Sequence, residues 1–221
     1  TKKIPALFEE ADGLWIRLQG RDREIVLEKY KKECEKKNKE FNPNHKHKTE
    51  LKLHVTYEGW SKNNNRYSLV NKSYIAGMMT PQTLEKLRNA RVYQKYNVKS
   101  IKLRASNGDG ARWINNIATK DTICQKDSFH IQQEIIRDIK SKEHREELIK
   151  IIKEKRYNEV HSYIENLKYE LGGEEKTVKK LKVLQSYLKE GLPRYQDILK
   201  EQSREIPQSP EGIEYRDMGT M

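Results

Sequence analysis

Two aspartates stand where a carboxylate could hold a metal ion. Asp109 lies in the run Gly108-Asp109-Gly110-Ala111-Arg112-Trp113-Ile114, shortly after an alternating apolar stretch that predicts a strand over 98–104. Asp12 has a similar setting in the alternating apolar segment 5–18. Ligands and metals collect at the carboxyl edge of the strands in open α/β sheets. The two aspartates therefore have the pattern of half a metal-ion active site.

Each aspartate also has a structural interpretation. Asp109 precedes a short helix predicted over 113–118, and an aspartate before a helix is a favoured N-cap because its carboxylate accepts a bond from a backbone N–H. Asp12 is followed by Gly13, and an Asp-Gly pair is by itself a strong hairpin-turn signal. A metal role for either residue therefore depends on the rest of the chain.

The composition favours a polyanionic partner. The 221 residues suit one large domain or a core with an insertion, and they carry 45 Lys and Arg against 33 Asp and Glu, a net charge of +12. Nucleic acid is the leading partner, and a membrane is disfavoured because no long apolar run and no lipidation motif is present. The two cysteines lack metal-ligand spacing and predict reduced thiols in a cytosolic protein.

The remaining patterns in the first half of the chain predict a mixed α/β sheet. A basic segment over 22–48 predicts a helix or a frayed connector, and Thr80 with Pro81 predicts the start of a helix. The further predicted elements are strands over 51–57, 66–78 and 122–125, and the helix over 81–96. This order is that of a ribonuclease-H-like core, in which the first and fourth strands are parallel neighbours. Asp12 and Asp109 would then converge, by analogy with that fold.

From about residue 131 the apolar spacing becomes helical. The stripes predict four or five amphipathic helices between 131 and 203, and they are interrupted too often for a coiled coil. Their members are Ile131, Ile135 and Ile139, then Leu148, Ile151 and Ile152, then Val160, Ile164, Leu167 and Leu171, and finally Val178, Leu181, Leu184 and Leu188. Proline and glycine near 207–212 mark a return loop. The predicted organisation is a catalytic core over 1–130, an all-α insertion over 131–206 after the fifth strand, and a return segment over 207–221.

Four motifs, in order along the chain, resemble those of the ISLre-like bacterial insertion-sequence transposases. The resemblance rests on the strand Glu10-Ala11-Asp12-Gly13-Leu14-Trp15, on Tyr57-Glu58-Gly59-Trp60 followed by Arg66-Tyr67-Ser68-Leu69-Val70-Asn71-Lys72, on Gly108 to Ile114, and on Asp127-Ser128-Phe129-His130. Each motif is weak alone, but four collinear motifs are specific.

The resemblance implies a DDE-type DNA transposase that cleaves and joins strands at element ends by two-metal-ion phosphoryl transfer. Asp12 and Asp109 would be its catalytic acids and would hold two Mg²⁺ or Mn²⁺ ions, with Asp127 and His130 as accessory residues. The third acid, a Glu, is expected just after Met221, because Asp217-Met218-Gly219-Thr220-Met221 resembles the approach to it. The chain would then be an incomplete catalytic domain, and as an isolated fragment it could lack activity.

The implied partner is double-stranded DNA with terminal repeats, bound by a homodimer on paired ends at the bacterial nucleoid in the cytoplasm. Arg112, Arg66 and Lys72 are the predicted phosphate contacts, although solvated strand-face charges explain the last two about as well. The alternative is a noncatalytic DNA-binding or assembly protein derived from a transposable element, for which the charge and the helical section would suffice. A structure-selective nuclease on the same core is a third hypothesis.

Overall fold

The computed structural model describes the chain except for residues 45–46, 172–174, 195–204, 217 and 219–221. The strands are β1 (Ala6–Arg17), β2 (Lys48–Tyr57), β3 (Trp60–Asn63), β4 (Arg66–Leu69), β5 (Ser73–Gly77), β6 (Leu103–Gly108) and β7 (Thr122–Lys126). The α-helices are α1 (Gly20–Lys36), α2 (Pro81–Lys95), α3 (Arg112–Ile117), α4 (Ser128–Asp138), α5 (Lys142–Lys153), α6 (Tyr157–Glu170) and α7 (Glu175–Gly191). Two 3₁₀ turns, η1 (Val98–Ser100) and η2 (Leu192–Arg194), complete the assigned elements.

Five strands form one mixed sheet in the order β5-β2-β1-β6-β7. β1, β6 and β7 run parallel, whereas β2 is antiparallel to both β1 and β5. β3 and β4 form a separate hairpin. Within the five-stranded sheet, β1 and β6 are the first and fourth strands, and they are parallel neighbours as the sequence predicts. The fold is therefore α/β, with a ribonuclease-H-like arrangement.

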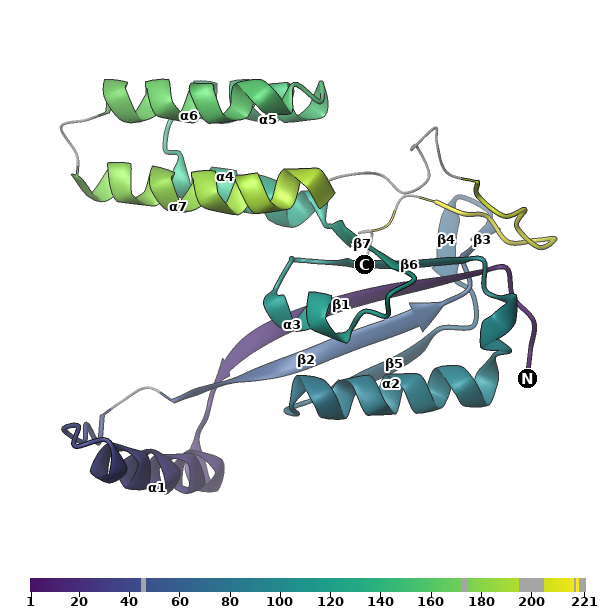
Figure 1. Ribbon diagram of the computed structural model, residues 1–221, viewed down its shortest axis with the longest axis horizontal. Coiled ribbons are helices and arrows are strands. Elements are labelled where there is room, and N and C mark those ends of the chain that lie inside the picture. Colours follow the sequence, from purple (N-terminus) through teal and green to yellow (C-terminus); the bar gives the residue numbers. More distant parts are fainter. Residues whose placement is uncertain (45–46, 172–174, 195–204, 217, 219–221) are drawn as a thin grey trace.

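The two faces of the sheet are covered by different parts of the chain. Alternate residues of a strand point to opposite faces, so Leu7 and Phe8 lie on different sides. Leu7 packs with Val92 of α2, and Figure 1 shows α2 and α3 on this side of the sheet. Phe8 packs on the other side against Trp60 and Tyr215. The centroid of each of these rings lies 5.2 Å from the centroid of the Phe8 ring. The segment near the end of the chain thus closes the second face.

β1 and β2 extend beyond their neighbours and carry α1 at their far end (Figure 1). Leu14 and Trp15 on this extension are each 62% exposed. Cys34 is the buried residue that the structure shows within α1. The predicted helix over 22–48 is therefore present as α1, but it forms an arm rather than part of the sheet layers.

The helices from α4 to α7 have an apolar core of their own. Ile135, Leu148, Ile164 and Leu184 are fully buried in it, and the core contains no residue of β1, β6 or β7. The predicted stripes are buried except for Val178, which is half-buried, and Leu171, which is 37% exposed at the end of α6. Residues 195–204 of the predicted insertion lie outside the described residues. None of the helices in the described parts of the chain has the length and apolarity needed to cross a bilayer.

Two predicted strand boundaries are wrong, and one alternative turn assignment is not found. The strand expected over 98–104 lies at Leu103–Gly108, because the Asn97 side chain accepts a bond from the Lys99 amide (3.2 Å) and starts the turn η1. The strand expected over 66–78 is split into β4 and β5 at Asn71, whose φ of +52° lies in the left-handed region. The Asp12-Gly13 pair is not a hairpin turn, since both residues lie inside β1 and pair with β2.

Candidate active site

Three neighbouring parallel strands each lead into an aspartate at the same level of the sheet. The register pairs Ala11 of β1 with Gly108 of β6, and Gly108 with Lys126 of β7. The next residue in each case is an aspartate, namely Asp12, Asp109 and Asp127. The Asp127 amide also donates to the Gly108 carbonyl (2.9 Å), which extends the alignment by one residue. The backbone register therefore brings Asp12 and Asp109 to neighbouring positions, as the predicted convergence requires.

Each of these carboxylates accepts a hydrogen bond from a nearby backbone amide. The Asp12 Oδ1 accepts from its neighbour Gly13 (2.7 Å), and the Asp109 Oδ1 accepts from Ala111 (2.7 Å). The N-cap of α3 is Ala111, so Asp109 braces the turn before the helix instead of capping it. Asp127 is the N-cap of α4 and accepts from Phe129 (2.8 Å). These bonds hold each carboxylate against the backbone that directly follows it.

A small cavity of about 150 Å³ opens beside these aspartates. Its lining residues are Glu10, Ala11, Asp12, Asn107, Gly108, Asp127, Phe129 and His130. It therefore gathers three of the predicted site residues, Asp12, Asp127 and His130. Asp109 is one residue beyond Gly108 and does not line the cavity itself.

Glu10 and Asn107 are site residues that the sequence analysis missed. They pair in register on β1 and β6, two positions before Asp12 and Asp109, and so share a face with them. Asn107 is 2% exposed and its Oδ1 has no hydrogen-bond partner among the described residues, whereas buried Glu10 accepts a bond from the Tyr57 hydroxyl (2.5 Å). Polar residues at inward positions of apolar strands are the sequence signal that could have found them.

The chemistry of these side chains fits a hard divalent cation. Carboxylate and amide oxygens are the ligands that Mg²⁺ and Mn²⁺ prefer, and an unpartnered buried amide oxygen such as that of Asn107 is available to such an ion. Among the residues whose placement is described, no three His, Cys, Asp or Glu side chains stand together as a ready-made metal site. Asp12 and Asp109 each use Oδ1 to accept a bond from a backbone amide, and a carboxylate has a second oxygen with which it can bind an ion.

A buried ionic cluster holds β1 from the opposite face. Glu9 is 1% exposed and accepts bonds from Arg88 of α2 (3.1 Å) and from two nitrogens of Arg104 of β6 (2.5 and 3.1 Å). Burial alone would raise the pKa of Glu9, but the hydrogen bond and charge of His54, together with Arg104 and Arg88, lower it to about 2. The strand that leads to Asp12 is thus tied to its neighbours by charge.

A second cluster fastens α3 to the residue after Asp12. Trp113 Nε1 donates to Glu50 Oε1 (2.9 Å), and Glu50 pairs with the buried Lys52 (2.5 Å). A Cβ atom on Gly13 would lie 2.3 Å from the same Glu50 oxygen. Glycine is therefore required for this close approach, and the approach connects the Asp12 and Asp109 motifs.

The predicted phosphate contacts lie at two ends of the sheet. Arg112 is exposed at the start of α3, next to the Asp109 turn. Arg66 and Lys72 are also exposed, but they follow Tyr57 of β2, which pairs with Phe8 near the start of β1. The structure therefore brings Arg112 to the aspartates and places Arg66 and Lys72 at the opposite end.

The positive charge is concentrated in the first part of the chain. Residues 1–130 contain 27 Lys and Arg against 15 Asp and Glu, whereas residues 131–206 contain 17 against 15. The helical section is therefore nearly neutral. The excess that favours a polyanionic partner belongs to the sheet and the α1 arm.

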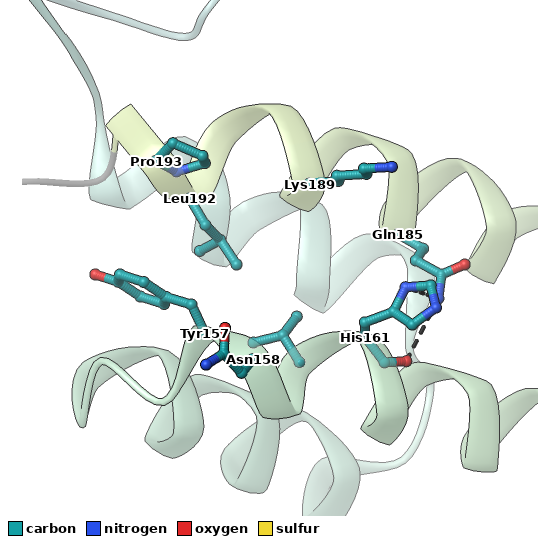
Figure 2. A pocket seen from close by; sticks show the side chains of 8 residues that line it. Tyr157, Asn158, His161, Gln185, Lys189, Leu192 and Pro193 are labelled. Carbon is teal, nitrogen blue, oxygen red and sulfur yellow. Dashed lines mark hydrogen bonds between the residues drawn. The ribbon is translucent and has the colours of Figure 1, made fainter.

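A larger cavity of about 700 Å³ lies in the helical section, between α6 and the end of α7 (Figure 2). Figure 2 shows Leu192 reaching towards α6, while His161 and Gln185 face each other across the helices (2.9 Å between Nδ1 and Nε2). Among the described residues that line this cavity there is no carboxylate and no predicted site residue. The carboxylates at the sheet edge therefore remain the candidate site.

Fold and site together define a ribonuclease-H-like α/β protein with an acidic strand edge and a helical section after the fifth strand of its main sheet. The chain belongs to the uncharacterised protein family UPF0236, whose family model matches residues 34–213. The match includes Asp109, Asp127 and His130 and begins after Asp12. No curated protein and no solved structure matches the chain.

The segment predicted to approach a third acid is largely outside the described residues. Of Asp217 to Met221, the structure describes Met218, which is buried against the Phe8 face of the sheet. The acid expected after Met221 lies beyond this sequence.

Proposed function

We propose that this chain is catalytic-domain sequence of a DDE-type DNA transposase, of the ISLre-like kind, which cleaves and joins DNA strands at element ends. The observation that carries the proposal is the alignment of Asp12, within β1, with Asp109 and Asp127, which follow the carboxyl ends of the parallel strands β6 and β7. That edge is where ligands bind in open α/β sheets. The four collinear motifs support the same assignment.

In this proposal Asp12 and Asp109 hold the catalytic cations, two Mg²⁺ or Mn²⁺ ions. Such a pair of ions activates the attacking oxygen and stabilises the leaving oxygen of an in-line phosphoryl transfer. Asn107 offers its unpartnered amide oxygen from the floor of the cavity. Asp127 lines the cavity while its Oδ1 caps α4, which keeps its carboxylate at the site.

Two further side chains have roles in handling DNA under this proposal. His130 lines the cavity beside Phe129, with ring centroids 5.6 Å apart, and its imidazole can orient a water molecule or contact the scissile phosphate. Arg112 is exposed next to the Asp109 turn and can bind a phosphate there. The substrate is double-stranded DNA with terminal repeats, held by a homodimer on paired ends at the nucleoid.

A second candidate function is a noncatalytic DNA-binding or assembly protein derived from such an element. The observation that favours it is the lack, within the described parts of the chain, of three metal-binding side chains already standing together. The positive charge of residues 1–130 would serve binding alone.

Nicking of supercoiled plasmid DNA in Mn²⁺ separates these functions. The chain is assayed as it stands and extended past Met221 with its natural sequence, each as wild type, as Asp109→Asn and as Asp121→Asn. Asp121 is an exposed aspartate between α3 and β7 and serves as the matched control. Cleavage by wild type and Asp121→Asn but not by Asp109→Asn supports the transposase. DNA binding without cleavage in every variant supports the noncatalytic protein, and cleavage by Asp109→Asn contradicts the metal role.

A further inference from the structure

Lys126 is a buried lysine at the edge of the candidate site. It is the last residue of β7, pairs in register with Gly108 and directly precedes Asp127. It is 6% exposed, although lysine is almost never buried without a compensating partner. A buried cation beside three aspartates therefore needs contacts that stabilise its charge.

One partner of Lys126 is an aromatic ring of the helical section. Its Nζ lies 3.3 Å from the centroid of the Tyr187 ring in α7. A desolvated ammonium over an aromatic face is a favourable cation–π interaction. The lysine of the sheet edge is thus held by a helix that packs in a different apolar core.

Two glycines make room for the same side chain. A Cβ atom on Gly110 would lie 2.9 Å from Lys126 Cε, and a Cβ atom on Gly191 would lie 2.9 Å from Lys126 Cδ. Gly110 follows Asp109 with a φ of +86°, and Gly191 is the last residue of α7. The lysine therefore runs in a slot between the Asp109 turn and the end of α7.

The slot is a point of contact between two parts of the chain that have separate apolar cores and that also meet where β7 contacts η2. The apolar cores around Phe8 and around Leu184 share no residue. α4 is joined to β7 through Asp127, and α7 packs against α4. A shift of the helical section relative to the sheet must therefore move Lys126 against the Gly110 turn.

We propose that Lys126 is a positioning residue that locks the Gly108–Ala111 turn against α7, so that docking of the helical section fixes Asp109 in the site. The effect of Lys126 on catalysis rests on the proposed function, whereas its effect on the conformation of the turn is independent of that function. The ammonium is the essential group, because it reaches the Tyr187 ring while its stem fills the slot. A side chain of similar length without charge leaves the ring contact unmade.

Hydrogen exchange of the peptide over 106–113, measured by mass spectrometry, tests the lock directly. Lys126→Met and Tyr187→Leu are each expected to raise the exchange of this peptide by about tenfold, whereas Tyr187→Phe keeps the ring and should match wild type. Lys120→Met, at an exposed lysine before β7, is the matched control. Wild-type exchange in both Lys126→Met and Tyr187→Leu would overturn the proposal. If Lys126→Met does not fold, the Tyr187 pair decides alone.

A second readout separates this proposal from the proposed function. In the plasmid assay, Lys126→Met and Tyr187→Leu should require about tenfold more Mn²⁺ for half-maximal cleavage, with Tyr187→Phe restoring the wild-type requirement. Faster exchange in these variants without cleavage by any chain would support the lock and reject the transposase. Cleavage that depends on Asp109 but has a wild-type Mn²⁺ requirement and exchange in both variants would reject the lock alone.

Discussion

The sheet region and the helical section of this chain are stabilised in different ways. The sheet buries charge, since Glu9 is enclosed with Arg88 and Arg104, and it also carries the positive excess of the chain. The helical section has a core of aliphatic side chains and exposed ion pairs, as between Lys142 and Glu146, and its buried carboxylate Asp138 pairs with the exposed Arg137 at the end of α4. Buried polar groups cost stability unless they are paired, so they concentrate where position matters.

Under the proposed function, this difference assigns the chemistry to the sheet region. The sheet region fixes the strand edge that carries Asp12 and Asp109, and its positive excess would bind the proposed DNA partner. The helical section is nearly neutral, and its residue Tyr187 contacts Lys126 at the edge of the sheet. Variants that affect one region and spare the other test this division.

The largest effect is expected from breaking the buried ionic cluster. Arg88→Met removes one partner of Glu9 and should lower the free energy of unfolding by about 3–5 kcal/mol, since a buried carboxylate loses its compensation. Lys142→Met breaks an exposed pair with Glu146 on α5 and should cost less than about 1 kcal/mol. Urea unfolding followed by circular dichroism gives both values, and similar losses would remove the contrast between the regions.

The next effect is a packing defect in the helical section. Leu184 is fully buried there, so Leu184→Ala should cost about 2–5 kcal/mol of stability. Because the positive excess lies elsewhere, the affinity of the folded variant for a short DNA duplex should stay at the wild-type value. Fluorescence anisotropy with labelled DNA checks this, and a large loss of affinity would show that the helical section contributes directly to binding.

Much of the fold could be predicted because it depends on periodicity. The stripe of Leu181, Leu184 and Leu188, the start of α2 at Thr80 and Pro81, and the parallel neighbours β1 and β6 are all confirmed. Apolar spacing and cap chemistry are local signals, and the sequence contains them in full.

The rest of the site depends on contacts between residues far apart in the chain. Glu9 and Arg88 are 79 positions apart, and Lys126 meets Tyr187 from another region. Neither pairing has a local signature, because charged residues on strands and helices are usually solvent-exposed. The shifted start of β6 and the break at Asn71 arise from single asparagine side chains and backbone conformations that alternation does not reveal.

A pH-dependent loss of stability should come from the sheet region. The pKa of Glu9 is lowered from 4.5 to about 2, so its contribution is fully present above about pH 4.5 and is lost as the pH falls towards 2. The shift corresponds to a loss on the order of 3 kcal/mol. Glu9→Gln should flatten the dependence of unfolding free energy on pH in this window.

The matched control for this titration is Glu165→Gln in the helical section. The pKa of Glu165 is lowered by its bond to Lys168, but the pair is at the surface and is screened by salt. In 0.5 M NaCl this variant should keep the wild-type pH dependence. If Glu9→Gln keeps it as well, the buried cluster is not its source.

The smallest effect is on the salt dependence of DNA binding. Arg66→Ala and Lys72→Ala should each reduce the slope of log K against log salt concentration by about 1 if each side chain binds a phosphate. The matched pair Lys179→Ala and Lys182→Ala, exposed on α7, should leave the slope unchanged. If all four variants keep the wild-type slope, neither Arg66 and Lys72 nor the α7 lysines contact a phosphate.

The central claim is that the aspartates at the edge of β1 and β6 hold divalent cations. Titration of Mn²⁺ into the full chain, followed by electron paramagnetic resonance of the free ion, tests it without DNA. The account predicts that wild type and Asp121→Asn bind Mn²⁺, and that Asp12→Asn and Asp109→Asn each weaken binding by more than about 100-fold. Binding at the wild-type level in both Asp12→Asn and Asp109→Asn would contradict it.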